Sequence, residues 1–234
     1  GVKKMNTLSE ALKERACEQT SNSAGTLEAA LLLLAFDNIP QCIILIHQAL
    51  EMTFKSYIGE REPELLNILN LFNPDDIDLF YEKLETPRPE KDEIGCNFDI
   101  DKNSGHLLAA LEVIDKRYDL KISKSKIKRV NKFRNDIVHQ GGQGKINTST
   151  LIKSFITGGW QQLSVFYREA YQIELCDHFF FNVKSSEIDA ELTNILSYLK
   201  QARQDSFPTN SAHGVVSTLI QSHMITGIGD AQVD

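Results

Sequence analysis

The sequence predicts an all-α protein, and two features of its apolar pattern carry this prediction. Apolar residues recur at three- and four-residue spacing through most of the 234-residue chain, which is the period of a helix with one buried face. No segment shows the strict apolar–polar alternation of a half-buried strand. An apolar content of 41% is ordinary for a globular protein, and the length suits one domain or at most two. We therefore expect a helical bundle with a sizeable core and additional C-terminal helices.

Helices in the first part of the chain are predicted from the apolar period and from residues that favour the first turn of a helix. Residues 6–24 are polar and predict a short helix or an ordered arm. Residues 26–36 are apolar almost all round, which predicts a buried helix. The helix at 40–57 begins with Pro40, because proline fits the first turn of a helix. Two shorter acidic helices follow at 64–72 and 75–84, before an exposed proline-rich loop at 86–103.

In the second part, helices are expected at 104–117, 124–139 and 151–171. Gly158-Gly159 interrupt the last of these, which predicts a bend or a close helix–helix approach. Trp160 and the aromatic residues after it lie at helical spacing, so they are expected in the core, with base stacking as the alternative. A further helix containing residues 188–199 should end before Pro208.

The pattern predicts four regions along the chain. These are an N-terminal arm at 1–25, a helical core at 26–145, C-terminal helices packed on that core at 146–205, and a tail at 206–234. Gly141-Gly142-Gln143-Gly144 form a flexible break near the end of the predicted core.

Composition narrows the class of protein. The four cysteines are widely scattered and form no Cys-x-x-Cys pair, so neither a zinc site nor a disulfide framework is expected. The longest apolar run is too short to span a bilayer, and the N-terminus does not resemble a signal peptide. We expect a cytoplasmic protein without a membrane segment, a metal site or a cofactor.

Charge is unevenly distributed along the chain, whose formal net charge is −7. Residues 60–101 contain thirteen acidic and four basic residues, a net charge of −9. Residues 115–134 contain nine basic and two acidic residues, a net charge of +7. A solvated lysine-rich helix face and a polyanion-binding face both explain the basic segment.

The basic segment leads into the most informative stretch, the helix at 124–139. Its apolar residues form one arc, and Arg134 falls within this arc. Asn135 and His139 lie one turn apart on the flank of the arc. Arg134 either pairs with a carboxylate in the core, beside a surface histidine, or holds a phosphate. In the second case its fixed fork of donors suits phosphate oxygens, and His139 can exchange a proton near neutral pH.

Two motifs in this chain resemble those of the HEPN superfamily, all-helical domains that include metal-independent endoribonucleases. Arg134-Asn135-x-x-x-His139 resembles the Arg-x(4–6)-His motif of that superfamily. Upstream, His47-Gln48-Ala49-x-Glu51-x-x-x-Lys55 is similar to its Gln-Ala-x-Glu-x-x-x-Lys pattern. The resemblance covers roughly residues 26–145 and leaves the C-terminal third unexplained.

The resemblance implies a homodimer in which two Arg-His motifs face one another across a cleft and cleave RNA. His139 would move the proton, Arg134 would hold the scissile phosphate, and Asn135 would orient the histidine. The flanking phosphates would be held by four cations: Lys126, Lys128, Arg129 and Lys132. His47 and Glu51 are either a polar pair at the edge of the core or auxiliary to the Arg134 site. One HEPN subgroup has a tyrosine where this chain has Gly141.

Such a ribonuclease could be a toxin or a defence effector, with a protein antitoxin or regulatory partner. One alternative is a non-catalytic HEPN-type module that binds RNA or a nucleotide, or that only dimerises. Another is a helical interaction protein in which Arg134 forms a buried ion pair. The position of Arg134 and His139 in the fold discriminates among these three functions.

Overall fold

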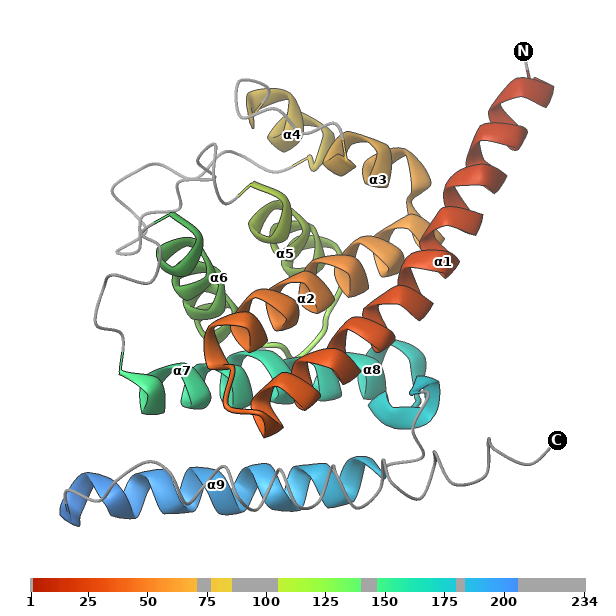
Figure 1. The fold of residues 1–234 in the computed structure, drawn as a ribbon. Helices are drawn as coiled ribbons and strands as arrows, with labels where there is room; N and C mark the ends of the chain where they lie inside the picture. Colours follow the sequence, from red (N-terminus) through yellow and green to blue (C-terminus); the bar gives the residue numbers. More distant parts are fainter. Residues whose placement is uncertain (1, 71–76, 86–104, 140–146, 180–183, 206–234) are drawn as a thin grey trace, which may run out of the picture. The chain divides into compact units, whose positions relative to one another are not determined.

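The computed structural model describes residues 2–70, 77–85, 105–139, 147–179 and 184–205, and all of their secondary structure is helical (Figure 1). The all-α prediction is therefore confirmed. The chain forms two compact units: unit 1 comprises Gly1–Asn22 and Leu50–Leu120, and unit 2 comprises Ser23–Ala49 and Lys121–Asp234. None of the helices in this described part combines the length and apolarity needed to cross a membrane.

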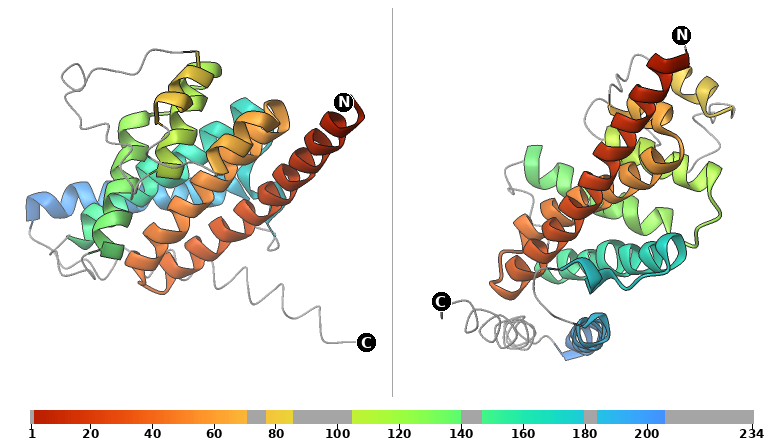
Figure 2. Two further views of the ribbon diagram at one scale, coloured as in Figure 1. Left: turned by 90° about the horizontal axis from the view of Figure 1, so that it is seen from above. Right: turned by 90° about the vertical axis from the view of Figure 1, so that its right-hand side faces the viewer.

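The first two helices each contribute to both units. Helix α1 spans Val2–Ala35 and α2 spans Ile39–Arg61. The C-terminal half of α1 and the N-terminal half of α2 run antiparallel within unit 2 (Figures 1 and 2). The tight connection between them contains Asp37 in the left-handed conformation, at φ 61°.

Two predictions about α1 were wrong. The helix does not begin at residue 26, because the polar residues 6–24 belong to the same continuous helix. These residues include no proline, and serine and threonine lower helix propensity only modestly. Nor is the apolar segment 26–36 buried all round, since Leu27, Leu31 and Leu34 are buried but Phe36 is 62% exposed.

Unit 1 packs the second half of α2 with three further helices. These are α3 (Pro63–Asn70), α4 (Ile77–Lys83) and α5 (Gly105–Arg117). Tyr118 follows α5, and its hydroxyl donates to Glu62 Oε1 over 2.6 Å. The predicted helices in this region are confirmed, whereas the predicted helix ends at residues 72 and 75 and the predicted loop at 86–103 lie outside the described residues.

Unit 2 contains the remaining helices. Helix α6 spans Lys124–His139, as predicted. Helix α7 (Thr148–Ser154), the π-helix η2 (Phe155–Trp160) and α8 (Gln161–Tyr171) then follow one another without a break. The short 3₁₀ helix η3 (Leu175–His178) leads to α9 (Ser185–Asp205), which ends before Pro208 as predicted. The predicted glycine break at 141–144 and the tail from 206 lie outside the described residues.

Helices α7, η2 and α8 form one continuous helical rod. Gly158 and Gly159 of η2 lie where this rod meets α6 and α2. A Cβ atom on Gly158 would lie 2.5 Å from the Lys126 carbonyl oxygen and 2.8 Å from Val130 Cγ2, both on α6. A Cβ atom on Gly159 would collide with the Ile46 side chain on α2. The predicted close helix–helix approach is thus confirmed. The π-helical turn supplies the local distortion, as single π turns inserted into α-helices commonly do.

We predict opposite effects for alanine at two glycines of unit 2. Gly158→Ala should destabilise the protein by about 1–3 kcal/mol, because its methyl group must displace the backbone of α6. Gly25→Ala should stabilise it by about 0.5–1 kcal/mol, since nothing lies within 4 Å of the added atom and alanine favours a helix interior. Urea denaturation of both variants measures the two effects. Equal stabilities would contradict the close approach.

Candidate functional site

The first half of helix α6 packs into the core of unit 2, whereas its second half, residues 132–139, is more exposed. We call this second half the open half of α6. Ile127, Val130 and Asn131 are buried, as expected for the face that meets η2. Further along the same apolar arc, Phe133 and Ile137 are half-buried, and Val138 is 47% exposed. The apolar arc therefore reaches the core only over its first half.

Arg134 lies on the open half of α6. Its side chain is half-buried, and its Nη1 donates a hydrogen bond to Asn135 Oδ1 over 3.0 Å. Within the described residues, Arg134 forms no ion pair with a carboxylate. The guanidinium consequently keeps donor groups that can receive an anion.

His139 is the last residue of α6, and its side chain is exposed. Asn135 was predicted to orient this histidine, but the hydrogen bond that the structure gives Asn135 comes from Arg134. Arg134, Asn135 and His139 nevertheless share the open half of one helix. Because Arg134 and His139 are five residues apart, their side chains project from the helix about 140° apart.

The upstream motif contributes a buried polar contact that the sequence did not reveal. His47 Nε2 lies 2.9 Å from Asn131 Oδ1, and both residues are buried. This contact joins α2 to α6 one turn before Asn135. Asn131 could have been suspected from its position at the edge of the apolar arc, where a polar residue needs a partner.

Glu51 is placed differently from His47. It lies in unit 1, where its Oε1 accepts a hydrogen bond from Lys55 Nζ over 2.7 Å. Glu51 and Lys55 of the upstream motif thus form an ion pair with each other along α2, one turn apart.

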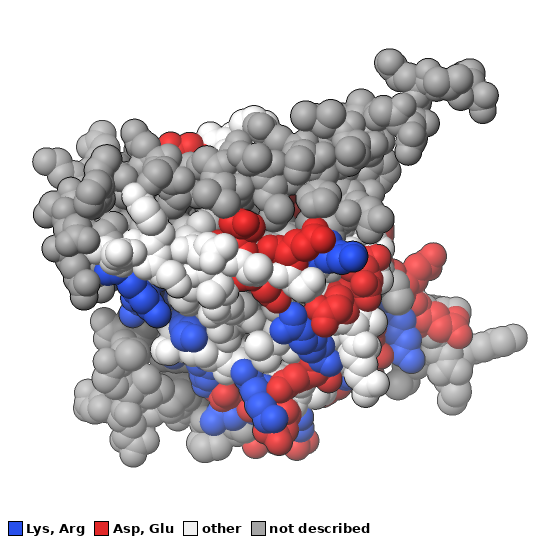
Figure 3. All heavy atoms as spheres, turned by 90° about the horizontal axis from the view of Figure 1, so that it is seen from below, with Lys and Arg blue, Asp and Glu red and all other residues white. Residues whose placement is uncertain are grey.

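The four predicted phosphate-binding cations lie on two sides of α6. Lys128, Lys132 and His139 are four and seven residues apart, so at about 100° per residue they share one flank. Lys126 and Arg129 are exposed on the other side of the helix. On the face drawn in Figure 3, Lys and Arg side chains lie beside Asp and Glu side chains. Lys128 and Lys132 therefore lie on the same flank as His139, whereas Arg134 projects from a different side of α6.

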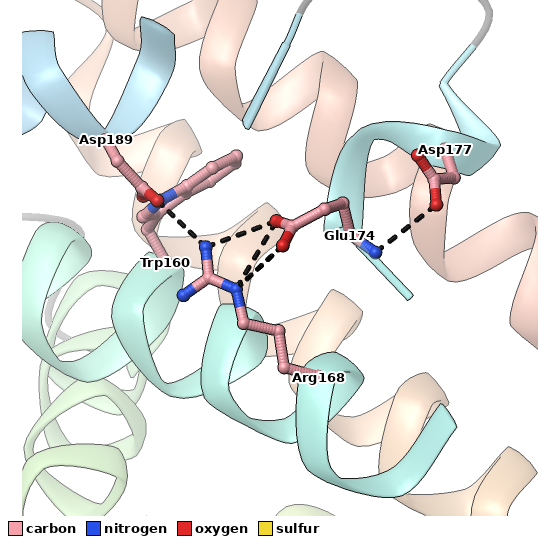
Figure 4. A network of polar contacts seen from close by, with 5 residues as sticks. All are labelled: Trp160, Arg168, Glu174, Asp177 and Asp189. Carbon is pink, nitrogen blue, oxygen red and sulfur yellow. Dashed lines mark hydrogen bonds and ion pairs between the residues drawn. The ribbon is translucent and has the colours of Figure 1, made fainter. Parts of the chain in front are cut away.

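A second polar cluster ties α8 to η3 and α9 (Figure 4). The Arg168 guanidinium donates to both oxygens of Glu174 and, over 3.0 Å, to Asp189 Oδ2. Trp160 Nε1 donates to the other oxygen of Asp189. The hydrogen bond from Arg168 lowers the pKa of Glu174 below its ordinary value, so the ion pair is intact throughout the ordinary carboxyl range and is lost only as the pH falls below that range, through the lowered pKa.

Trp160, Phe166 and Tyr167 are buried, which confirms the prediction that they belong to the core, whereas Tyr171 is only half-buried. Cysteine chemistry has little support in the described residues. Burial holds the pKa of the Cys42 thiol well above its ordinary value and raises that of Cys176 to about 12. Among the side chains that the structure describes, no three His, Cys, Asp or Glu gather as a metal site would require.

Comparisons with protein-family models, with curated proteins and with solved structures yield no match to this chain.

We predict that the buried contact between His47 and Asn131 stabilises unit 2. His47→Ala and Asn131→Ala should each lower the free energy of unfolding by about 1–3 kcal/mol, because each removes one member of a buried hydrogen-bonded pair. The double variant should lose less than the sum of the two single losses. Chemical denaturation of the four proteins tests this, and strict additivity would contradict the contact.

Proposed function

We propose that this protein is a HEPN-type endoribonuclease, and the placement of Arg134 carries the proposal. An arginine that lies on an apolar arc, without a carboxylate partner in the described residues, is suited to receive an anion. His139 lies five residues later on the same open half of α6, with its imidazole exposed to a substrate. The order and spacing of these residues are those of the Arg-x(4–6)-His motif.

In the proposed reaction, the 2′-hydroxyl of a ribose attacks the adjacent phosphorus. A His139 imidazole accepts the hydroxyl proton, and the bond from phosphorus to the 5′-oxygen breaks. A protonated His139 returns a proton to this leaving oxygen, which gives a 2′,3′-cyclic phosphate and a 5′-hydroxyl. Arg134 holds the non-bridging oxygens, whose negative charge grows in the transition state.

The role that we propose for Asn135 differs from the one expected from the sequence, which was to orient His139. Because its amide oxygen accepts from Arg134 Nη1, we assign it to positioning the guanidinium. Lys128 and Lys132 share the flank of His139 and would hold neighbouring phosphates of the RNA. Lys126 and Arg129 lie on the other side of α6, so their contribution to the same RNA would be smaller.

We further propose that two copies of the chain associate through the open half of α6. Phe133, Ile137 and Val138 leave apolar surface beside Arg134, and such surface is commonly covered in a complex. A two-fold contact there would bring two Arg134–His139 pairs to one cleft. One His139 could then act as the base and the other as the acid. A toxin or defence role, with a protein antitoxin or regulator to restrain it, is part of this proposal.

A non-catalytic RNA-binding module is the second proposed function, and one observation favours it. No hydrogen bond within the described residues fixes the His139 ring, whereas catalytic histidines are usually oriented by a partner. Such a module would use Arg134 and the lysines to bind RNA without cutting it.

We predict that Arg134→Ala and His139→Ala each abolish RNA cleavage, because a methyl group replaces neither a phosphate fork nor a proton carrier. EDTA should leave cleavage by the unaltered protein unchanged. Arg15→Ala and His178→Ala are matched controls, since both residues are exposed and lie outside α6. Purified proteins are incubated with cellular RNA, and the products are resolved by electrophoresis.

Cleavage that survives in either α6 variant, or that requires a divalent metal, would contradict the proposed mechanism. RNA binding without cleavage, weakened by Arg134→Ala, would favour the non-catalytic module instead.

We also predict that Lys128→Ala and Lys132→Ala weaken RNA binding without changing the site of cleavage. Each lysine contributes a phosphate contact, so each variant should reduce the slope of log affinity against log salt by about 0.7–1. Titration of labelled RNA at several salt concentrations measures this slope. An unchanged slope in both variants would place the RNA on another surface.

A further inference from the structure

Helix α1 has two apolar faces along its last turns, which belong to unit 2. One face is buried and contains Leu27, Ala30, Leu31 and Leu34. At about 100° per residue, a second apolar face lies on the opposite side of the helix. It consists of residues at the i, i+3, i+4 and i+7 spacing of a helix face, namely Ala29, Leu32, Leu33 and Phe36. Phe36 continues the last turn of α1, because its backbone N–H donates to the Leu32 carbonyl oxygen.

The second face is only partly covered by the rest of the chain. Ala29, Leu32 and Leu33 are half-buried, and Phe36 is 62% exposed. In the described part of the chain, no large apolar side chain is more exposed than that of Phe36. Contiguous exposed apolar surface commonly marks a site of association with another molecule.

Gly25 extends this face by one turn, and nothing within the chain explains a glycine there. Glycine destabilises a helix interior relative to alanine. Gly59, Gly158 and Gly159 are each explained by a neighbouring element, because a Cβ atom on any of them would collide with another residue. A Cβ atom on Gly25 would have no atom within 4 Å, and Gly25 is exposed. The absent side chain therefore leaves room on the outer surface of α1.

We call this outer surface the α1 stripe, and it consists of Gly25, Ala29, Leu32, Leu33 and Phe36. Its two ends have complementary shapes. Gly25 and Phe36 are eleven residues apart in the chain, which is about 16 Å along the helix and within about 20° of the same side. A large side chain at one end and a gap at the other suit a surface that pairs with a reversed copy of itself.

The register of such a pairing follows from these positions. In an antiparallel contact whose two-fold axis passes midway between residues 30 and 31, Gly25 faces the partner's Phe36. Ala29 then faces the partner's Leu32. A small residue meets a large one at both positions, which is how facing helix surfaces interdigitate.

We propose that the α1 stripe is the contact surface for a second copy of this chain, with the two α1 helices antiparallel about a two-fold axis. A two-fold contact requires a self-complementary surface, and the matched positions of Gly25 and Phe36 supply one. The stripe contains no charged side chain, so no like charges meet across it. A contact of about three helical turns is small beside the roughly 800 Å² per partner of a stable complex, so the dimer should dissociate readily.

This contact is separate from the one proposed at the open half of α6, and it does not rest on ribonuclease activity. The α1 stripe and the apolar residues of α6 lie on different helices, so each contact can be removed without the other. A chain with two different two-fold contacts forms assemblies larger than a dimer. Loss of the α6 contact should therefore leave a dimer that is held by α1.

Sedimentation velocity of the full chain, at concentrations from about 1 μM to about 1 mM, measures this association. Val138→Glu places a charge in the α6 contact and is the background in which the α1 contact is tested. We expect this variant to form a dimer. Adding Gly25→Gln should weaken the dimer about tenfold or more, because the longer side chain occupies the place of the partner's Phe36.

Gly25→Gln meets open space within its own chain, so thermal melting by circular dichroism should show a folded protein. Lys153→Gln, at an exposed lysine of α7, is the matched control and should leave the dimer unchanged.

A pair of charge variants in the same background tests the antiparallel register. Gly25→Lys and Phe36→Glu should each weaken self-association about tenfold or more when alone. Mixed in equal amounts, the two variants should associate with each other. In the antiparallel contact the introduced lysine meets the introduced glutamate, whereas a parallel contact would keep the two charges apart.

Three results would each overturn the proposal. These are a Val138→Glu variant that is monomeric at every concentration, unchanged association after Gly25→Gln, and failure of the mixed charge variants to associate. None of these results bears on RNA cleavage by Arg134 and His139, so the two proposals fail separately.

Discussion

Two adjacent glycines allow one helical rod to lie against two others, and the features of unit 2 that bear on function depend on that approach. Gly158 meets the backbone of α6 at Lys126, and Gly159 meets Ile46 on α2. Any side chain at either position would force the helices apart. The buried contact between His47 and Asn131 joins the same α2 and α6 a little further along. Together these contacts fix the first half of α6.

This arrangement gives the two ends of α6 different environments. The first turn lies near the Arg168 ion-pair cluster, which reaches α9. The last turns contain Arg134, Asn135 and His139 on a surface that is half-buried or exposed. Because the first half of α6 is fixed by packing, the side chains on its second half are held in place, as binding or catalytic groups require.

Periodicity and breaker residues predicted much of this fold. The bounds of α6 were predicted correctly, because its apolar period is regular and it ends at a glycine-rich segment. The close approach at Gly158-Gly159 was also predicted, since paired glycines inside a helical pattern usually serve packing. The continuity of α1 was not predicted, because a polar helix without an apolar arc resembles an arm. Neither was the exposure of Phe36, which depends on where the neighbouring elements end.

The candidate sites were predictable only where one helix determines the spacing. Arg134, Asn135 and His139 could be placed together because they lie within two turns. The partner of His47 could not, since Asn131 is 84 residues away in the chain. The cluster around Arg168 was likewise hidden, because Glu174 and Asp189 come from separate elements. Long-range pairing of this kind has no local pattern in the sequence.

The proposed function requires RNA to bind to the open half of α6, and amide hydrogen exchange can detect this binding. The full chain is compared with and without an oligonucleotide whose 2′-hydroxyls are methylated, which cannot be cleaved by the proposed route. We expect slower exchange in residues 132–139 on binding, with little change in residues 124–131, which are already held by η2 and α2. Protection confined to other helices, or none at all at saturating oligonucleotide, would contradict it.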